Sequence, residues 1–357
     1  MQCNISFMKG LLHLSIIIPL LIWIACDDNK VSDNDYNTLH EFVLHSNNRV
    51  SSLLMTESEY DIWINEDGFS DPSIRVPLVQ DVYERFEDKY DFIFFVLNEE
   101  SIPENLYYYG KLIGVSNNVQ GIGMNEYDYS PDYGSSGKLK AVMQLTGLEF
   151  LQTGPALHEL AHQWANYALP THNVNELGMN VTSYPYWGHW GFTGGSSPGQ
   201  LGGFNQSSLI ENGNSSYTVD YFGAFANGGN GVPYNELELY LMGMLPITSV
   251  SPFDMFTDIT SLAIDESTYD LTFTAARTTY THSSLEDSLG SRIPSIDNSQ
   301  KEFKLLVIII TDTPLSDDEW NKADATAEWF SHKGDDGSNL YNFWEATNGI
   351  GSIIIEN

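Results

Sequence analysis

Cysteine is almost absent from this chain. The 357 residues include only two cysteines, Cys3 and Cys26, and both lie near the N-terminus. A disulfide framework or a cysteine-ligated metal site in the body of the protein is therefore excluded. A cysteine nucleophile is excluded for the same reason.

Basic residues are also scarce. Fifteen Lys and Arg face 48 Asp and Glu, which gives a formal net charge of -33. Such a chain repels a phosphate backbone, so we exclude nucleic acid as a partner. The excess of carboxylates favours solubility, and some of them are also suited to bind Ca²⁺. The segments 33–35 and 335–339 carry suitable oxygen ligands, but neither completes an EF-hand loop, so calcium is only a second candidate cofactor.

The N-terminus carries an apolar run over residues 11–25, preceded by Lys9. The run is shorter than the roughly 20 residues that span a bilayer, and Pro19 interrupts it. The pattern predicts a signal peptide over residues 1–25. The polar residues 26–55 then suggest a tether before the folded part.

The end of this signal resembles that of bacterial lipoproteins. Ala25 precedes Cys26, and Asp27 and Asp28 follow at once, although Trp23 departs from the usual Leu-like residue. The resemblance implies a lipid on Cys26 and a place in the outer membrane or on the cell surface. An ordinary secretory signal is the alternative, and it too predicts export.

The folded part mixes helical and strand patterns, which predicts an α+β fold. Apolar spacing predicts a helix at 77–86, and a continuous apolar run predicts a buried strand at 92–97. Further strands are expected at 107–115 and 139–145. A longer helix is expected from 155 to 169, before Pro170.

The second half is more varied. Residues 171–232 are rich in Gly, Asn, Ser and aromatics, which predicts long functional loops. Beyond them we expect helices at 235–244, 317–329 and 339–346 and strands at 271–280, 303–310 and 352–355. We expect a catalytic domain over residues 56–250 and a C-terminal α/β subdomain over 251–357.

The pattern with the clearest chemistry is His158-Glu159-Leu160-Ala161-His162. Residues i and i+4 share one face of a helix, so His158 and His162 can direct two imidazoles at one ion. Glu159 lies about 100° around the helix, where it can reach a water beside that ion. Zn²⁺ lowers the pKa of a bound water to near 7, and Glu159 would act as general base.

This motif, continued by Gln163 and Trp164, resembles the metal helix of zincin metallopeptidases. The resemblance is firm over the helix and looser over residues 75–250. It implies a twisted mixed sheet above the metal helix, Zn²⁺ as cofactor, and hydrolysis of protein or peptide bonds. A catalytic zinc then needs a third protein ligand and one open position.

The third ligand does not follow the short metzincin pattern, because Ala165 and Ala168 stand where that pattern has a glycine and a ligand. We favour His189, which lies in a frame of aromatic residues and glycines, since imidazole suits zinc. Glu236 or Glu238 is the alternative, as in sites with two histidines and a glutamate. His172 is a third candidate.

Supporting roles are less specific. Met242 is a candidate to lie beneath the metal, as the methionine turn of metzincins does, or simply to pack the core. Glu238 is a candidate to accept a hydrogen bond from a ligand histidine. Four tyrosines are candidates to stabilise an oxyanion: Tyr184, Tyr186, Tyr221 and Tyr240.

These features predict a monomeric, lipid-anchored zinc metalloendopeptidase that acts on extracellular protein or peptide. The alternative is a non-catalytic surface lipoprotein with a structural zinc, or one that binds glycans or glycoproteins. In that second case, aromatic rings of the Gly-rich segment would stack on sugars: Trp187, Trp190, Phe192 and Phe204.

Overall fold

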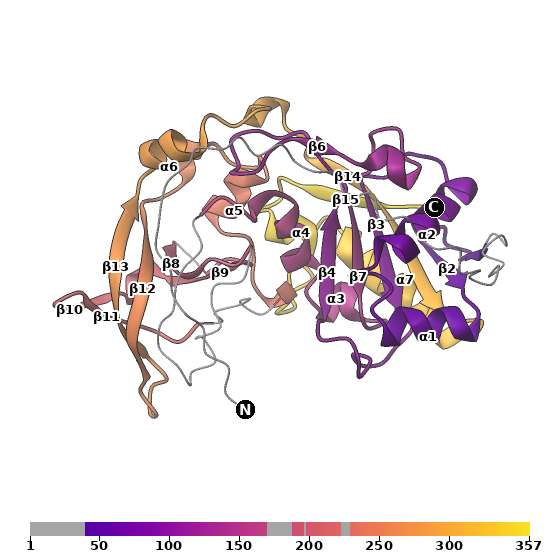
Figure 1. Ribbon diagram of the computed structural model, residues 1–357, viewed down its shortest axis with the longest axis horizontal. Helices are drawn as coiled ribbons and strands as arrows, with labels where there is room; N and C mark the ends of the chain where they lie inside the picture. The colour runs from indigo at the N-terminus through magenta and orange to yellow at the C-terminus, as the bar shows by residue number, and fades with distance from the viewer. Residues whose placement is uncertain (1–39, 170–187, 196–197, 223–228) are drawn as a thin grey trace, which may run out of the picture. The chain divides into compact units, whose positions relative to one another are not determined.

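Helices and strands alternate along the chain and build mixed sheets, as expected for an α+β protein (Figure 1). The computed structural model describes residues 40–169, 188–195, 198–222 and 229–357. None of the helices in these ranges is long and apolar enough to cross a membrane.

The first sheet has seven strands. Their order is β1 (Glu41–Leu44), β2 (Val50–Leu54), β14 (Glu302–Thr311), β3 (Phe92–Leu97), β7 (Ala141–Leu145) and β4 (Gly110–Gly114), and β15 (Ser352–Ile355) also pairs with β14. The neighbours of β14 are all parallel to it, and β3 and β7 are parallel. The outer strands β1 and β4 run antiparallel to their neighbours. Parallel strands are buried on both faces, which explains their continuous apolar runs.

Helices cover both faces of this sheet. On one face, Ile93, Phe95 and Leu97 of β3 pack in a cluster with Trp63 of α1 (Glu57–Asn65) and Val79 of α2 (Pro72–Arg85). Figure 1 shows these two helices together beside the sheet.

The opposite face packs against the other helices. The alternate residues of β3, Phe92, Phe94 and Val96, share a cluster with α4 (Ala156–Ala165), α7 (Asp317–Ser331) and α8 (Phe343–Ala346). Because successive side chains of a strand point to opposite faces, one strand supports both layers. The motif His158–His162 lies on α4 and therefore in this layer.

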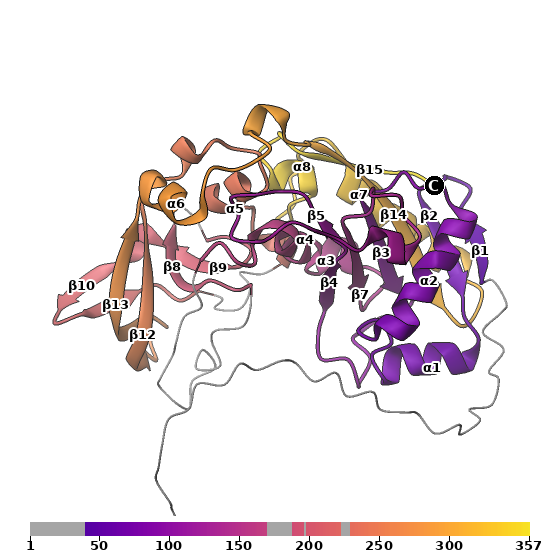
Figure 2. The same ribbon diagram turned by 45° about the horizontal axis from the view of Figure 1, so that its top comes forward.

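The second sheet has six strands, and its core is aromatic. Their order is β10 (Ile210–Gly213), β11 (Ser216–Val219), β13 (Leu271–Tyr280), β12 (Phe253–Ile264), β8 (Gly191–Gly195) and β9 (Gly202–Asn205). Figure 2 shows β12 and β13 as a long antiparallel pair. Phe192, Phe204, Phe256 and Phe273 are almost fully buried in it, and the rings of Phe192 and Phe273 lie 4.9 Å apart.

Smaller elements join the sheets. They are β5 (Ser116–Asn117), β6 (Tyr127–Asp128), α3 (Phe150–Thr153), α5 (Glu236–Leu241) and α6 (His282–Leu289).

Three expectations about the layout need correction. The expected tether over 26–55 includes β1 and β2, because β2 pairs with β14 far along the chain. The expected boundary at residue 250 does not separate two sheets, since β14 lies at the centre of the first sheet. The described part of 171–232 contains four strands, β8 to β11, where long loops were expected. Strand β8 pairs with β12, and β11 pairs with β13, and these long-range pairings leave little local pattern.

Candidate metal centre

Helix α4 presents the two histidines of the motif from a buried base. Leu157, Leu160, Ala161 and Trp164 are all buried in the core below the first sheet. The helix N-terminus is fixed by Asn230, whose Oδ1 accepts from Leu157 N at 3.0 Å. The hydroxyl of Tyr234 donates to the carbonyl of Leu157 at 2.8 Å. The motif is therefore held in place by both packing and hydrogen bonds.

Three imidazoles converge on one point. Nε2 of His158 lies 3.0 Å from Nε2 of His189 and 3.2 Å from Nε2 of His162. Ligands at 2.0–2.1 Å around a tetrahedral ion stand roughly 3.3 Å apart, so these separations suit a metal ion. Among the described residues, the three histidines form a group that could hold such an ion.

The far side of each motif histidine faces an acceptor. Nδ1 of His158 lies 2.7 Å from the carbonyl oxygen of Gln200, and Nδ1 of His162 lies 2.6 Å from Oδ1 of Asn166. A carbonyl oxygen only accepts, so both Nδ1 atoms carry the proton and both Nε2 atoms present lone pairs. Two lone pairs that face each other at 3.2 Å are suited to share a bound cation. Such oriented histidines are typical of metal ligands.

The histidines are also in the right charge state. Burial lowers the pKa of His162 to about 4 and that of His189 to about 3. Burial, together with the two neighbouring imidazoles, also lowers the pKa of His158. All three are neutral near pH 7, and neutral imidazole is the form that binds a metal.

Glu159 lies between α4 and the edge strand β4. The backbone N–H of Leu112 donates to its Oε2 at 3.1 Å. A Cβ at Gly110 would lie 2.8 Å from Cγ of Glu159, so only glycine leaves room for this side chain. Burial raises the pKa of Glu159 to about 8, against the opposing effects of the Leu112 hydrogen bond and the charge of Lys111. The carboxyl group is thus held at the edge of the sheet.

His189 lies two residues before β8 and reaches the site from there. Gly188 has a φ of 85°, and a Cβ there would lie 2.6 Å from Oδ1 of Asn166 and 2.8 Å from Nδ1 of His162. Nε1 of Trp190 donates to the carbonyl of Ala165 at the end of α4, at 3.2 Å. Glycine before and tryptophan after His189 therefore fix it against the metal helix.

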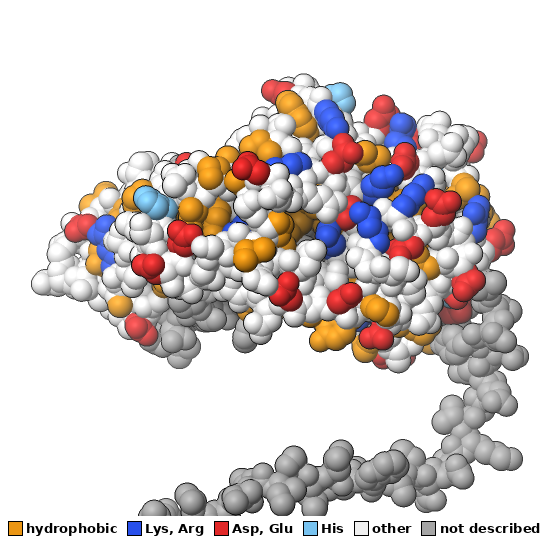
Figure 3. All heavy atoms as spheres, turned by 90° about the horizontal axis from the view of Figure 1, so that it is seen from above, with side chains coloured by type: hydrophobic (Ala, Val, Ile, Leu, Met, Phe, Trp, Pro, Cys, Tyr) orange, Lys and Arg blue, Asp and Glu red, His pale blue; other side chains and the backbone are white. Residues whose placement is uncertain are grey.

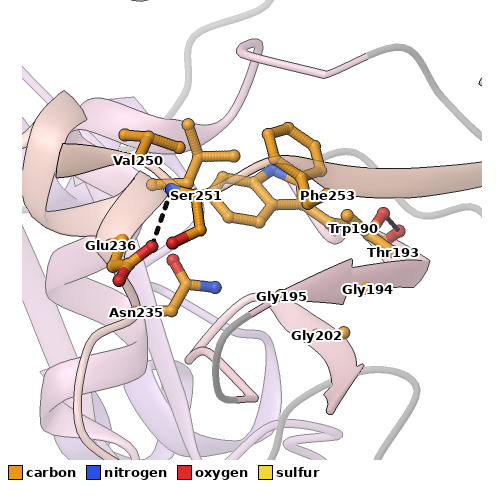
Figure 4. Close-up of a pocket in the computed structure, with 12 residues that line it drawn as sticks. Trp190, Thr193, Gly194, Gly195, Gly202, Asn235, Glu236, Val250, Ser251 and Phe253 are labelled. Atoms are coloured by element: carbon orange, nitrogen blue, oxygen red, sulfur yellow. Dashed lines mark hydrogen bonds between the residues drawn. The ribbon is translucent and has the colours of Figure 1, made fainter. Parts of the chain in front are cut away.

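The alternative glutamates lie elsewhere. Oε1 of Glu238 accepts from Leu201 N at 2.8 Å, and Oε2 accepts from Asn235 N at 2.9 Å. This carboxylate thus holds the turn whose Gln200 carbonyl faces His158. Glu236 accepts from Ser251 N at 2.8 Å, beside a small cavity that Trp190 also lines (Figure 4). Among the described residues, neither glutamate joins the three histidines in the group of possible metal ligands.

The other candidates are dispersed. Tyr240 is buried, and the charges of Glu286 and Arg292 act on it. Met242 is buried in the core and lines a cavity together with Trp164 and Arg292. Tyr221 is 62% exposed. The remaining candidates lie outside the described residues: Cys26, His172, Tyr184, Tyr186 and Trp187.

A cleft of about 620 Å³ adjoins His162. It is lined on one side by Leu112 and Gly114 of β4 and on another by Tyr127 and Tyr129. The Tyr127 hydroxyl approaches Gly114 so closely that a Cβ there would clash with it. Sequence reasoning missed this cleft, because the loop that builds it carries no motif.

The residues that orient the histidines were also missed. Asn166 follows His162 by four positions, so helical spacing alone was a usable signal. The Gln200 carbonyl and the Leu112 N–H are backbone groups, and no side-chain pattern reveals them.

One acidic group bears on the calcium expectation. Asp335 and Asp336 gather with Glu345 of α8 so that their ligand atoms lie within 4.8 Å of one another. The same carboxylates already accept from local backbone N–H groups of Gly337, Ser338 and Asn342. Exposed acidic groups are common without an ion, so calcium stays an expectation.

Comparison with known protein families, with curated proteins and with solved structures finds no match to this chain.

Proposed function

We propose that this chain is a zinc-dependent metalloendopeptidase of the zincin type, exported and anchored by a lipid on Cys26. One observation carries the proposal. Nε2 of His158 lies 3.0 Å from Nε2 of His189 and 3.2 Å from Nε2 of His162, and the Nε2 atoms of His158 and His162 present lone pairs. A bound cation would satisfy these lone pairs in a buried site, which supports the proposal.

The ligand set favours zinc. Three imidazole nitrogens suit Zn²⁺ better than the oxygen-preferring Ca²⁺ or Mg²⁺. Three protein ligands would also leave the fourth position open, as catalytic rather than structural zinc sites do. When bound, the ion would lower the pKa of a water to near 7 and polarise a carbonyl.

Glu159 is the residue to which we assign proton transfer. It lies on α4 beside His158, and its carboxyl group accepts from Leu112 N of β4. Its pKa is raised by burial, but a bound cation would favour the ionised form, which would take a proton from the attacking water and then deliver that proton to the leaving amide nitrogen. The carboxyl group thus moves one proton and returns to its starting state.

The edge of the first sheet is a candidate place for a peptide substrate. Strand β4 is the last strand on its side and pairs only with β7 among the described strands. An extended peptide can add to such an edge through backbone hydrogen bonds, while pockets select its side chains. The cleft beside His162, with Tyr127 and Tyr129, is the nearest such pocket.

The glycan-binding alternative loses its main support. Trp190, Phe192 and Phe204 are exposed by no more than 2% and pack in the core, so they offer no rings to a sugar. A structural, non-catalytic zinc remains the outcome against which the proposal is tested.

The test measures zinc content and cleavage of casein by the wild-type protein and by Glu159→Ala. We expect equal zinc in both and cleavage by the wild type alone. Zinc without cleavage in either protein would show a structural site, and a wild-type protein without zinc would refute the metal centre. Glu236→Gln is the matched control and should behave as the wild type.

A further inference from the structure

A second cavity, of about 250 Å³, lies behind the metal helix. Trp164 of α4, Phe303 of β14 and Met242 contribute apolar surface to it. Lys140 and Arg292 contribute charge, and the amides and hydroxyl of four neighbours contribute hydrogen-bonding groups: Asn118, Asn298, Ser299 and Gln300. None of these residues takes part in the proposed peptidase chemistry.

Arg292 brings a positive charge that no carboxylate balances. Its Nε donates to the carbonyl of Leu241 at 3.1 Å, and its Nη1 donates to the carbonyl of Pro294 at 2.6 Å and to the hydroxyl of Ser299. These acceptors are neutral. In the described chain, no carboxylate oxygen lies within the 4.0 Å of an ion pair with Arg292. Burial lowers the pKa of Arg292 to about 10, which still leaves it charged at neutral pH.

Two lysines lie at or near this cavity. Nζ of Lys301, which does not line it, donates to the carbonyls of Gly243 and Ile296; the charge of Arg292 repels Lys301, and the charge of Asp297 attracts it. Lys140 stands 4.0 Å from Asp91, a carboxylate that Lys138 approaches more closely, at 3.3 Å. One buried carboxylate is thus shared by two lysines, and the cavity keeps an excess of positive charge.

This gathering is unusual for a chain with a net charge of -33 and only fifteen basic residues. Figure 3 shows several Lys and Arg side chains on one face of the molecule, with Asp and Glu side chains among them. Like charges brought together raise the free energy of the fold unless an anion joins them. Arg292 and Lys301 donate to the carbonyls of Leu241 and Gly243 at the C-terminal end of α5. Lys140 has no part in that capping.

We propose that this cavity binds a small organic anion, in which a carboxylate meets Lys140 and Arg292 and an apolar body lies against Trp164 and Phe303. The volume is below the roughly 300–1,000 Å³ of sites for drug-sized ligands, so the occupant is a single ring or a short acid. Charge-assisted hydrogen bonds would hold the carboxylate, and aromatic surface would hold the body.

The test measures binding of benzoate by calorimetry at low salt. Benzyl alcohol is the control that keeps the aromatic ring without the charge, and inorganic phosphate is the control that keeps the charge without the ring. We expect the wild type to bind benzoate at least about tenfold more tightly than either control probe. Equal binding of benzyl alcohol would overturn the role of charge. Equal binding of phosphate would overturn the role of the apolar wall.

Two lysine variants locate the site. Lys140→Gln should weaken benzoate binding about tenfold, while its zinc content stays at the wild-type level. Lys333→Gln removes the same charge from an exposed pair with Glu302 and should leave benzoate binding unchanged. Equal affinity in the wild type and Lys140→Gln would overturn the proposal, and so would an equal loss in Lys333→Gln.

Discussion

The two sheets of this protein are built on different principles. The first uses parallel strands with continuous aliphatic and aromatic runs, covered by helices on both faces. The second uses mostly antiparallel strands, with β8 and β9 parallel to each other, and several of them are short and glycine-rich around a cluster of phenylalanines. The three histidines divide in the same way: His158 and His162 stand on a helix under the first sheet, and His189 lies two residues before β8 of the second.

This division shows which part of the fold fixes the position of each histidine. His158, His162 and Glu159 share one helix with a deeply packed back, so their geometry follows from local structure. His189 is held instead by its neighbours Gly188 and Trp190, next to β8 of the second sheet. In the proposed enzyme, the first region would supply the chemistry and the second would complete the metal site.

The largest expected effect breaks the chemistry in the first region alone. Glu159→Gln keeps an oxygen to accept from Leu112 N but cannot take a proton, so kcat should fall about 10²–10⁴-fold. Peptide cleavage with zinc content measured in parallel checks this. Activity within a few-fold of the wild type would show that another group is the base.

A core substitution in each sheet tests whether the two regions are separate. Phe273→Ala and Phe95→Ala each remove a fully buried ring and should each cost about 3–5 kcal/mol of unfolding free energy. Phe273→Ala should reduce hydrogen-exchange protection mainly in β12 and β13. Equal loss of protection in β3 would show that the two sheets unfold as one unit, and the contrast between them would fail.

The third ligand sharpens the comparison at the site itself. His189→Ala should lower zinc affinity by at least about a hundredfold, because even groups that only support a ligand contribute 10–100-fold. Competition with a chelator of known affinity measures this. Glu236→Gln serves as the control and should retain the wild-type affinity. Unchanged affinity in His189→Ala would move the third ligand to another residue.

The smallest effect concerns an ion pair in the second sheet. Burial alone raises the pKa of Asp254, but hydrogen bonds from Arg277, Thr279 and Gln206 outweigh it and leave the pKa below its ordinary value. A lowered folded pKa stabilises the protein above the unfolded pKa of about 3.9, and this stabilisation is lost as pH falls through the folded pKa.

Asp254→Asn should therefore cost about 1–3 kcal/mol at pH 7 and less at pH 3. Denaturant unfolding at the two pH values checks this. An equal cost at both pH values would mean that the charge of Asp254 does not stabilise the sheet.

Sequence reasoning found the first region better than the second. The strand Phe92–Leu97 was predicted with its observed bounds, because a buried parallel strand is a continuous apolar run. His158 and His162 followed from helical spacing. Strands β1 and β2 were missed, since β2 is defined by pairing with β14, about 250 residues away. Strands β8 and β9 were missed because glycine hides the alternating pattern of a strand.

The central place of β14 has a consequence for how the protein is made. Strands β2 and β3 both pair with β14, which the ribosome synthesises about 200 residues after β3. At about 5–20 residues per second, the apolar edge of β3 waits roughly 10–40 s for its partner, and that of β2 waits longer. During that interval the nascent chain exposes unpaired apolar strands that are prone to aggregate. We therefore expect it to depend on a chaperone that shields these strands until residue 311 has emerged.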